Sequence, residues 1–416
     1  MTSLRPVEEQ LGLVLSRVRL LAAQSLPLSA AGGRTLREPV RARVDIPVFD
    51  NSAMDGFAVR FEDVKDAAPD APVRLRVVAD LPAGSPLDPP LGHGDAARIM
   101  TGSAVPTAAD AIVPFEDTAG GLADSLGEIA VTSAPAAVGA HVRRRGGDAA
   151  VGDVVVAAGI RLGPLQLAAA AAAGVPDVVV AARPRIAVVS TGSELVAPGR
   201  TLQRGQIPES NSELLAGLAA DAGADVVLRA SVADDGGGLA RVMARVAAAG
   251  SPELVDVVVF SGGVSAGAYE VVKNELAGTM EFAKVAMQPG KPQGFGVTAD
   301  GVLLFGLPGN PVSAAVSFEV FVRPALLALQ GRTHLQRPLL RLPAAARWRT
   351  PPGRRQYLPA AIDTADPSRW TVSPATAGGS ASHLAGGLAR ADAYAIVPAE
   401  VDVVTEGTFV DVMLIS

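Results

Sequence analysis

The segment from Val302 to Ser313 places the strongest constraint on how this chain can fold. It reads VLLFGLPGNPVS, so four apolar residues come directly before a run rich in glycine and proline. The apolar residues predict a buried strand, and the run after them blocks regular structure because proline fixes φ and glycine permits turns. Pro311 then stands where a helix over residues 312–329 can begin. Free backbone N–H groups at such a helix start can bind an anion, although the same spacing also fits an ordinary strand-to-helix turn.

Three further segments have a similar composition. The apolar residues 186–189 lead into STGSE, and the apolar residues 257–260 lead into SGGVSAG. The third segment, QPGKPQG at residues 288–294, holds Lys291 between two prolines. In an open α/β sheet, the loops at the carboxyl ends of the strands converge on one crevice. Small residues, hydroxyl groups and one fixed cation in that crevice favour phosphate or another oxyanion.

Strand and helix signals alternate through the part of the chain that contains these loops. The predicted strands are residues 186–189, 225–232, 255–260, 281–287 and 302–305, and the predicted helices are residues 209–222, 239–249, 269–276 and 312–329. This alternation predicts a doubly wound α/β domain whose sheet is mainly parallel. Short strands broken by Pro, Gly and Asp predict a β-rich module before it, and a Pro- and Arg-rich tail with short strands predicts a small β-barrel after it.

Composition excludes several classes of protein. The 36 basic and 42 acidic residues give a formal net charge of −6, which argues against a general nucleic-acid-binding protein. The absence of cysteine excludes disulfides, thiolate nucleophiles and cysteine-bound metals, and the four histidines lack the short spacing of a zinc site. The first residues do not follow the order of a signal peptide, and no uninterrupted apolar run approaches the roughly 20 residues of a membrane helix. We therefore predict a soluble, cytoplasmic protein with no membrane partner.

Six sequence words together resemble the molybdopterin molybdenumtransferase family, which includes bacterial MoeA and the E domain of gephyrin. They are DNSAMDGFA at 50–58, MTG at 100–102, STG at 190–192, SGGVS at 261–265, PGKP at 289–292 and GLPGNPVS at 306–313. The words follow the order of the family and cover nearly the whole chain. The resemblance implies a transferase that inserts molybdate into adenylylated molybdopterin, forming molybdenum cofactor and releasing AMP, with a divalent ion such as Mg²⁺.

The resemblance also implies a domain organisation. A chain of 416 residues is long enough for two to four domains. We expect a helical linker domain from residues 1–43 plus 143–183, interrupted by an inserted β-rich module at residues 44–142. An α/β molybdopterin-binding domain follows at residues 184–331, and a C-terminal β-barrel domain at residues 332–416. Pro6 and the apolar spacing after it predict an amphipathic helix over residues 7–23, and Gly163-Pro164 predicts a second helix over residues 165–173.

The resemblance assigns substrate-binding roles to residues of every strand-end loop. Lys291 is the strongest candidate for binding molybdate, with Ser313 as a hydroxyl donor. Further contacts would come from Arg354, which its neighbour Arg355 could replace, and from Ser382. The full set of predicted substrate-binding residues is Ser190, Thr191, Gly192, Ser193, Ser261, Gly262, Gly263, Ser265, Lys291, Pro308, Gly309, Asn310, Pro311, Ser313, Arg354 and Ser382.

Carboxylates are the natural ligands of magnesium, and the acidic site of the family maps onto several positions. The predicted catalytic residues are Asp55, Thr101, Glu194, Asp234 and Glu270, and the predicted metal ligands are Glu194, Asp234 and Asp235. The chain departs from the family at two positions. Glu270 stands where the family commonly has aspartate, and Gln288 stands where some members have lysine, which puts the metal geometry and the strength of oxyanion binding in question.

Asp55 and Thr101 are far in sequence from the phosphate loops. In the family's homodimer the inserted module completes the cleft of the partner subunit, so both residues would act in trans on a shared active site. An upstream molybdopterin adenylyltransferase would supply the substrate. Two other functions are considered: the chain could itself be a molybdopterin adenylyltransferase, since that related domain shares the Ser-Gly-Gly theme, or it could be a non-catalytic, gephyrin-like scaffold.

Overall fold

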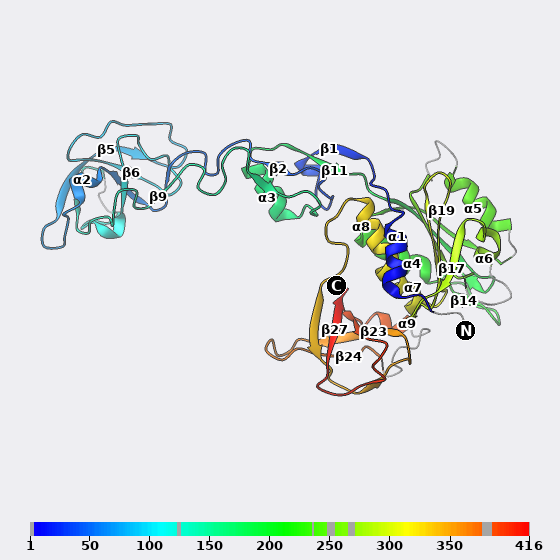
Figure 1. The fold of residues 1–416 in the computed structure, drawn as a ribbon. Helices are drawn as coiled ribbons and strands as arrows, with labels where there is room; N and C mark the ends of the chain where they lie inside the picture. Colours follow the sequence, from blue (N-terminus) through cyan, green and yellow to red (C-terminus); the bar gives the residue numbers. More distant parts are fainter. Residues whose placement is uncertain are drawn as a thin grey trace.

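The computed structural model describes residues 4–122, 126–234, 237–247, 254–264, 271–376 and 385–415. Figure 1 shows an elongated molecule with a β-rich module at one end and the α/β part beside a C-terminal sheet at the other. A narrow middle segment joins the two ends, and the chain runs through this segment twice. The predicted site residues are therefore divided between two distant parts of the molecule.

A six-stranded sheet forms the centre of the α/β part. Its order is β15 (Asp225–Val232), β12 (Arg185–Thr191), β16 (Val257–Ser261), β20 (Leu303–Leu307), β19 (Pro292–Val297) and β17 (Met280–Lys284). The first four strands are parallel, and the last two are antiparallel to their neighbours. Side chains alternate between two buried clusters along β12, where Ile186 and Val188 join one cluster and Ala187 and Val189 join the other. Both faces of the strand are apolar because both faces are covered.

Helices supply the other side of each cluster. α4 (Asn211–Asp221) and α7 (Pro311–Ser317) contribute to the first cluster, whereas α5 (Gly237–Ala247) and α6 (Val271–Leu276) contribute to the second. β15 coincides with the predicted strand at residues 225–232, and the neighbouring elements start and end within a few residues of their predicted bounds. The periodicity of the sequence therefore located this part of the fold well.

One strand of the central sheet was missed. Residues 292–294 were predicted to be part of a loop, but they begin β19, which pairs with β17 and β20. Pro292 and two glycines obscure the strand pattern because proline and glycine normally weaken strands. The glycines are required by packing, since a Cβ atom at Gly296 would lie 2.2 Å from the carbonyl oxygen of Thr279, and one at Gly294 would lie 2.8 Å from the Phe282 ring.

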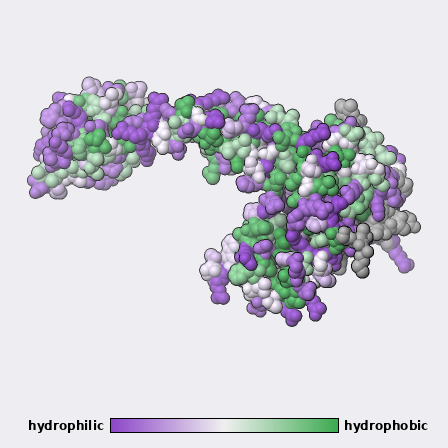
Figure 2. Space-filling model, viewed as in Figure 1, coloured by the Kyte–Doolittle hydropathy of each residue, from purple (hydrophilic) through white to green (hydrophobic). Residues whose placement is uncertain are grey.

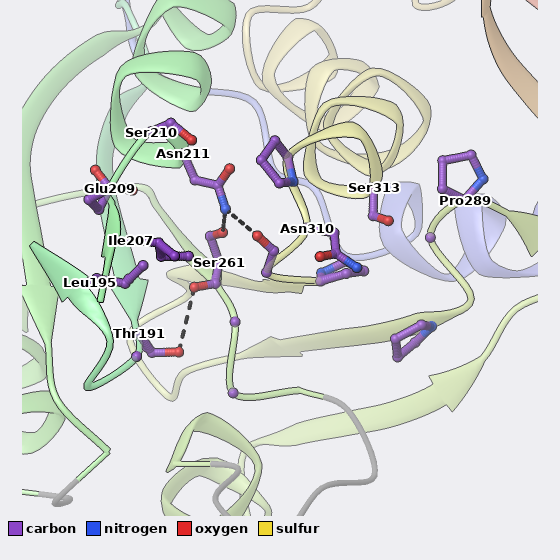
Figure 3. Close-up of a pocket in the computed structure, with 18 of the residues that line it drawn as sticks. Thr191, Leu195, Ile207, Glu209, Ser210, Asn211, Ser261, Pro289, Asn310 and Ser313 are labelled. Atoms are coloured by element: carbon purple, nitrogen blue, oxygen red, sulfur yellow. Dashed lines mark hydrogen bonds between the residues drawn. The ribbon is translucent and has the colours of Figure 1, made fainter. Parts of the chain in front are cut away.

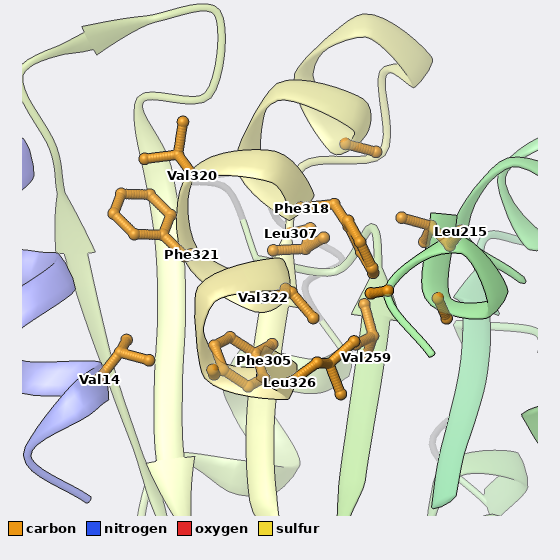
Figure 4. Close-up of a cluster of buried hydrophobic side chains, with 14 of the residues drawn as sticks. Val14, Leu215, Val259, Phe305, Leu307, Phe318, Val320, Phe321, Val322 and Leu326 are labelled. Atoms are coloured by element: carbon orange, nitrogen blue, oxygen red, sulfur yellow. The ribbon is translucent and has the colours of Figure 1, made fainter. Parts of the chain in front are cut away.

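A long apolar helix follows the loop after β20. It comprises α7, the π-helical segment η3 (Phe318–Val322) and α8 (Arg323–Leu329). Among the described residues, Pro311–Leu329 is the one helix whose length and mean hydropathy of 1.7 would suffice to cross a membrane. Its most apolar window is 89% buried inside the protein, so this segment is a core helix. Figure 4 shows Val14, Leu215 and Val259 lying around this helix, each from a different element.

The first helix is shorter than predicted. α1 (Val7–Leu15) ends well before residue 23, where β1 (Ala23–Pro27) begins. The Ser16 hydroxyl group donates to the Leu13 carbonyl oxygen at 2.7 Å near the end of α1, and the Leu21 amide donates to the Leu329 carbonyl oxygen at 2.9 Å. α1 contacts α8 and η3, so it packs on the α/β part rather than within the middle segment.

The middle segment was predicted to be helical, but it contains more strand than helix. β1 pairs with β11 (Asp177–Ala181), and β2 (Val40–Arg41) pairs with β10 (Val154–Val156). A single-turn 3₁₀ helix η1 (Leu28–Ala30) and the helix α3 (Pro164–Ala172) complete it among the described residues. The helical prediction holds for α3 alone, because the rest of this segment gains its hydrogen bonds from chain passes that are far apart in sequence.

The β-rich module has its own sheet and its own buried clusters. The sheet order is β7 (Ala111–Pro114), β4 (Gly56–Val59), β6 (Asp95–Ile99), β5 (Val73–Leu81) and β8 (Glu128–Val131). Two short strands, β3 (Asn51–Ser52) and β9 (Val142–Arg143), close its base, and α2 (Phe61–Val64) and η2 (Phe115–Asp117) lie in its connections. Both of its apolar clusters draw their residues from positions 57–142. The module is therefore a separate packing unit.

The C-terminal sheet is joined directly to the α/β part. Its order is β18 (Met287–Gln288), β23 (Arg355–Asp363), β25 (Ala393–Val397), β27 (Phe409–Leu414) and β21 (Leu339–Pro343), with β24 (Thr371–Pro374) paired to β23. β22 (Trp348–Arg349) pairs with β26 (Val403–Val404), and a short helix α9 (Ala385–Leu388) lies nearby in the chain. β18 pairs in parallel with the start of β23, which places the residues before β23 beside the Lys291 loop.

Candidate functional site

A cleft of about 790 Å³ opens at the carboxyl ends of β12, β16 and β20. Figure 3 shows the loops that surround it. Most of the predicted residues line this cleft, namely Thr191, Gly192, Glu194, Asp234, Ser261, Gly262, Gly263, Lys291, Pro308, Gly309, Asn310, Pro311, Ser313 and Arg354. Short strands β13 (Leu195–Val196) and β14 (Ile207–Pro208) form part of its wall. The prediction that strand-end loops converge on one crevice is thus met in the structure.

The loops after β12 and β16 are packed against each other with no room for side chains. Gly262 and Gly263 have φ values of 97° and 66°, a region that favours glycine. A Cβ atom at Gly262 would lie 2.6 Å from the Thr191 carbonyl oxygen. The Gly309 loop is also close, since a Cβ atom at Gly309 would lie 3.5 Å from the Gly262 Cα atom. Backbone hydrogen bonds hold this close approach, since the Gly262 amide donates to the Leu307 carbonyl oxygen at 3.0 Å and the Gly192 amide donates to the Val232 carbonyl oxygen at 3.1 Å.

Two predicted serines do not line the cleft. The Ser190 hydroxyl group is buried and donates to Glu209 Oε1 at 2.8 Å. The Ser193 amide donates to Asp234 Oδ2 at 3.2 Å, and the Asp234 amide donates back to the Ser193 hydroxyl oxygen at 3.1 Å. These serines fix the loop after β12 rather than offering donors to the cleft.

Glu209 was missed by the sequence analysis. Its side chain is 8% exposed, and Oε1 also accepts a hydrogen bond from the Ser212 amide at 3.0 Å. The carboxylate therefore holds the start of α4 against the end of β12. The sequence signal was a glutamate at the start of a predicted helix, which is common in exposed first turns and does not indicate burial.

Two buried amide side chains were also missed. Asn211 Nδ2 donates to the Ser261 hydroxyl oxygen and to the Gly309 carbonyl oxygen, each at 2.6 Å. Gln293 Nε2 donates to the Gly290 carbonyl oxygen at 2.6 Å and to the Ser317 hydroxyl oxygen at 2.7 Å. The contacts of Asn211 join residues 50 and 98 positions away, so no local pattern could have revealed them.

The charged residues of the cleft come from opposite walls. Lys291 follows β18 and Arg354 precedes β23, and both line the cleft. Arg355 instead pairs with Glu8 of α1, which leaves Arg354 as the arginine at the cleft. Glu194 and Asp234 line the wall formed by the β12 and β15 ends. Among the residues that the structure describes, no group of three or more His, Cys, Asp or Glu side chains is placed so that it could hold a metal ion.

Asp55 and Thr101 lie in the β-rich module, far from the cleft of the same chain (Figure 1). Asp55 Oδ1 accepts hydrogen bonds from the Thr101 amide at 2.6 Å and from the Thr101 hydroxyl group at 2.8 Å. These two bonds hold the pKa of the Asp55 carboxyl group below its usual range. Both residues are exposed, so the structure brings them to each other but not to the phosphate loops of their own chain.

The remaining predicted residues lie outside the part of the chain that the structure describes. They are Asp235, Ser265, Glu270 and Ser382. The departure at Glu270 therefore stays a prediction. Gln288, the other departure, lines the cleft beside Lys291. Its neutral amide adds no charge to that wall.

The fold and the cleft define a multidomain protein with a polar cleft at the strand ends of an α/β domain. Three protein-family models match consecutive parts of the chain: "MoeA N-terminal region (domain I and II)" at residues 5–174, "Probable molybdopterin binding domain" at residues 187–328, and "MoeA C-terminal region (domain IV)" at residues 341–415. The chain belongs to the MoeA family, and the predicted family resemblance is confirmed.

Relatives and solved structures agree with this assignment. Molybdopterin molybdenumtransferase 2 of Mycobacterium tuberculosis is 43% identical over 417 residues, which is 97% of this chain and 98% of the relative. Molybdopterin molybdenumtransferase of Synechococcus elongatus is 36% identical and matches 94% of each chain. The crystal structure of a molybdopterin biosynthesis MoeA protein from Pyrococcus horikoshii has a TM-score of 0.83 at 26% identity, covering 99% of this chain and 100% of that one. The multidomain MoeA-like fold is therefore confirmed.

Proposed function

We propose that this protein transfers molybdenum from molybdate to adenylylated molybdopterin, releasing AMP and forming molybdenum cofactor. The observation that carries the proposal is the convergence of three strand-end loops, Lys291 and Arg354 on one cleft in a chain that belongs to the MoeA family. The name molybdopterin molybdenumtransferase of its relatives agrees with this activity. An upstream molybdopterin adenylyltransferase is the proposed source of the substrate, and the cytoplasm is the proposed compartment.

The residues of the cleft suit the two substrates separately. The loops at residues 261–263 and 308–313 bring small residues and hydroxyl groups to the cleft, where they suit the pyrophosphate of the pterin substrate. Lys291 and Arg354 provide the positive charge that a compact dianion such as molybdate requires. Ser313 is 4% exposed at the start of the long helix, where its hydroxyl group can donate to either anion. These contacts hold the molybdate beside the pterin and orient its phosphoanhydride.

Magnesium fits the acidic wall of the cleft. This ion usually keeps several waters and binds through one or two carboxylates together with substrate phosphates. Glu194 and Asp234 supply two carboxylates at the cleft, and we propose that they hold the ion. When bound, magnesium would neutralise charge on the phosphoryl oxygens during release of AMP. The chain's own part is to keep the carboxylates in place, and the two hydrogen bonds between Asp234 and Ser193 do this for Asp234.

We further propose a homodimer in which the β-rich module of one subunit completes the cleft of the other. Asp55 and Thr101 form an exposed pair at the far end of the molecule, where a second copy can reach them. Figure 2 shows apolar side chains among polar ones along the middle segment. Leu165 is 80% exposed, Val151 58% and Val154 48%, and a partner subunit would remove these side chains from water.

Molybdate-dependent release of AMP from adenylylated molybdopterin tests the proposal. A molybdopterin adenylyltransferase would instead consume ATP and molybdopterin and form the adenylylated product. A scaffold would do neither. Release of AMP that requires molybdate and is absent with ATP plus molybdopterin supports the transferase, and formation of adenylylated molybdopterin by the purified protein would overturn it.

A further inference from the structure

Two buried carboxamides hold the cleft through the same pattern of hydrogen bonds. Asn211 is 8% exposed and Gln293 is 2% exposed. Each side chain donates one hydrogen to the carbonyl oxygen of a loop glycine and the other to a serine hydroxyl oxygen. Carbonyl oxygens only accept hydrogen bonds, so the amide nitrogen of each side chain must be the atom that faces its glycine.

Asn211 joins the two loops that face the pterin pyrophosphate. It is the first residue of α4, yet its side chain points away from its own helix to Ser261 and to Gly309 (Figure 3). Its Oδ1 atom is buried and has no hydrogen-bond partner among the described residues, so both contacts of the amide pass through Nδ2. Asn211 Nδ2 therefore adds a side-chain link between the Ser261 and Gly309 loops, beyond the backbone hydrogen bond from the Gly262 amide to the Leu307 carbonyl oxygen at 3.0 Å.

Gln293 plays the corresponding part on the Lys291 side. Gly290 precedes Lys291, and its carbonyl oxygen is held to the buried Ser317 of α7 through Gln293 Nε2. Gly290 has a φ of 99°, and a Cβ atom there would lie 2.8 Å from the Ser317 hydroxyl oxygen. The Lys291 carbonyl oxygen accepts from the Val285 amide at 2.8 Å, so the backbone around this cation is fixed from both sides.

We propose that Asn211 and Gln293 are positioning residues that act on different substrates. Asn211 fixes the spacing of the loops that bind the pterin pyrophosphate, and Gln293 fixes the loop that aims Lys291 at molybdate. Figure 3 shows Asn211 and Pro289 on different sides of the cleft, which allows the two amides to act separately. This inference rests on the proposed function, because it assigns one substrate to each loop set.

Near-isosteric apolar substitutions test the proposal without changing the charge of the cleft. Asn211→Leu should weaken binding of adenylylated molybdopterin by about tenfold while molybdate binding stays within about twofold, because a buried carbonyl loses its donor on one side only. Gln293→Met should weaken molybdate binding by about tenfold and leave the pterin substrate within about twofold. Calorimetric titration of each ligand into the full-length protein measures both constants.

Two control variants share the surroundings of the tested residues. Ser212→Ala removes a hydrogen bond to Glu209 at the same helix start but touches neither the Ser261 nor the Gly309 loop. Thr298→Val removes the acceptor of the Val302 amide next to β19. Both controls should bind both ligands as the unmodified protein does. If the apolar variants fail to fold, Asn211→Ser and Ser317→Ala place no long apolar side chain in the site and should give the same crossed pattern with smaller changes.

The pattern of changes decides the matter. A crossed pattern supports the proposal, whereas equal weakening of both ligands by either variant, or no weakening, would overturn it. The proposed function fails in a different way, since a protein with intact crossed binding but no molybdate-dependent release of AMP would keep its positioning residues and lose its assigned reaction. Failure of the unmodified protein to bind either ligand would contradict both the proposed function and the proposed positioning roles.

Discussion

The cleft and the β-rich module both carry polar residues of the family, but in opposite settings. In the cleft, Asn211, Ser261 and Ser313 are 8%, 1% and 4% exposed, and long-range hydrogen bonds hold two of them. In the module, Asp55 and Thr101 are exposed and bonded to each other. A single chain therefore builds the walls of the cleft, while the polar pair of the module faces solvent. The cleft can therefore be interpreted from one chain, whereas the role proposed for the module pair requires a second chain.

Mixing two inactive variants gives the largest expected effect and tests the comparison most directly. Asp55→Ala and Glu194→Ala should each be nearly inactive as homodimers, because every shared cleft would lack one carboxylate. Subunit exchange forms mixed dimers in which one cleft carries both substitutions and the other carries neither. Random exchange should restore about a quarter of the activity of the unmodified protein, measured as molybdate-dependent release of AMP.

A lack of rescue, with subunit exchange shown by native mass spectrometry, would contradict the proposal that the two subunits share each active site. Asp55 would then be a turn residue of the module. The matched control is a mixture of Glu194→Ala with Asp234→Ala, both from the same cleft wall. In a mixed dimer of these variants each cleft keeps one defect, so this mixture should show no rescue in either case.

Lys291→Ala should weaken molybdate binding by roughly tenfold to more than a hundredfold. Loss of a hydrogen bond to a charged group costs about 1.5–3 kcal/mol, and Lys291 stands at the cleft between two prolines. Binding of the pterin substrate should change less, which calorimetric titration of both ligands can measure. Lys284→Ala is a matched control, because Lys284 lies in β17, is exposed and does not line the cleft. Unchanged molybdate affinity in a folded Lys291→Ala protein would rule out Lys291 as a ligand.

Glu194→Gln should bind adenylylated molybdopterin yet release AMP slowly. The neutral amide keeps the shape of the side chain but is a poorer magnesium ligand than a carboxylate. The expected result is a fall in kcat of about tenfold or more with a small change in KM, measured across a range of magnesium concentrations. Full turnover of this variant at ordinary magnesium concentration would show that Glu194 is not a magnesium ligand.

Thr101→Val tests the exposed pair and gives the smallest expected effect. The Thr101 hydroxyl group and amide both lower the pKa of the Asp55 carboxyl group, so loss of the hydroxyl should raise that pKa while the amide keeps it below the ordinary value. Because the pKa of the Asp55 carboxyl group is lower in the folded protein than in the unfolded chain, this group stabilises the folded state fully at pH values above its unfolded-state pKa. The stabilisation is lost as the pH falls through the folded-state pKa. NMR titration of the Asp55 carboxyl carbon measures the shift, and an unchanged pKa would show that the hydroxyl group does not interact with the carboxylate.

The sequence predicted the loop positions because local chemistry decides them. The strand before Gly306 and the helix after Pro311 follow from an apolar run, prolines and glycines within a few residues, and β20 and α7 occur there. β19 was missed because its glycines are required by close packing against Thr279 and Phe282, which lie in other parts of the chain. Local patterns can indicate a turn, but they do not report which distant backbone will approach it.

The candidate site divides in the same manner. Lys291 and the glycines of the loop after β16 were predicted because residue type and family word point to them, and they line the cleft. Glu209, Asn211 and Gln293 were not predicted, because each looks like an ordinary polar residue at the start of a helix or strand. Their importance comes from contacts across the fold, 19 positions away for Glu209 with Ser190 and 98 for Asn211 with Gly309.

The separate apolar clusters of the β-rich module have a consequence for how the protein melts. The clusters of the module draw on residues 57–142, whereas the largest cluster draws on α1, the central sheet, the long helix and the C-terminal sheet. Cooperative unfolding extends only as far as shared packing does. Calorimetry should therefore record at least two heat-absorption peaks, and the β-rich module should be able to unfold while the α/β part and the C-terminal sheet stay folded.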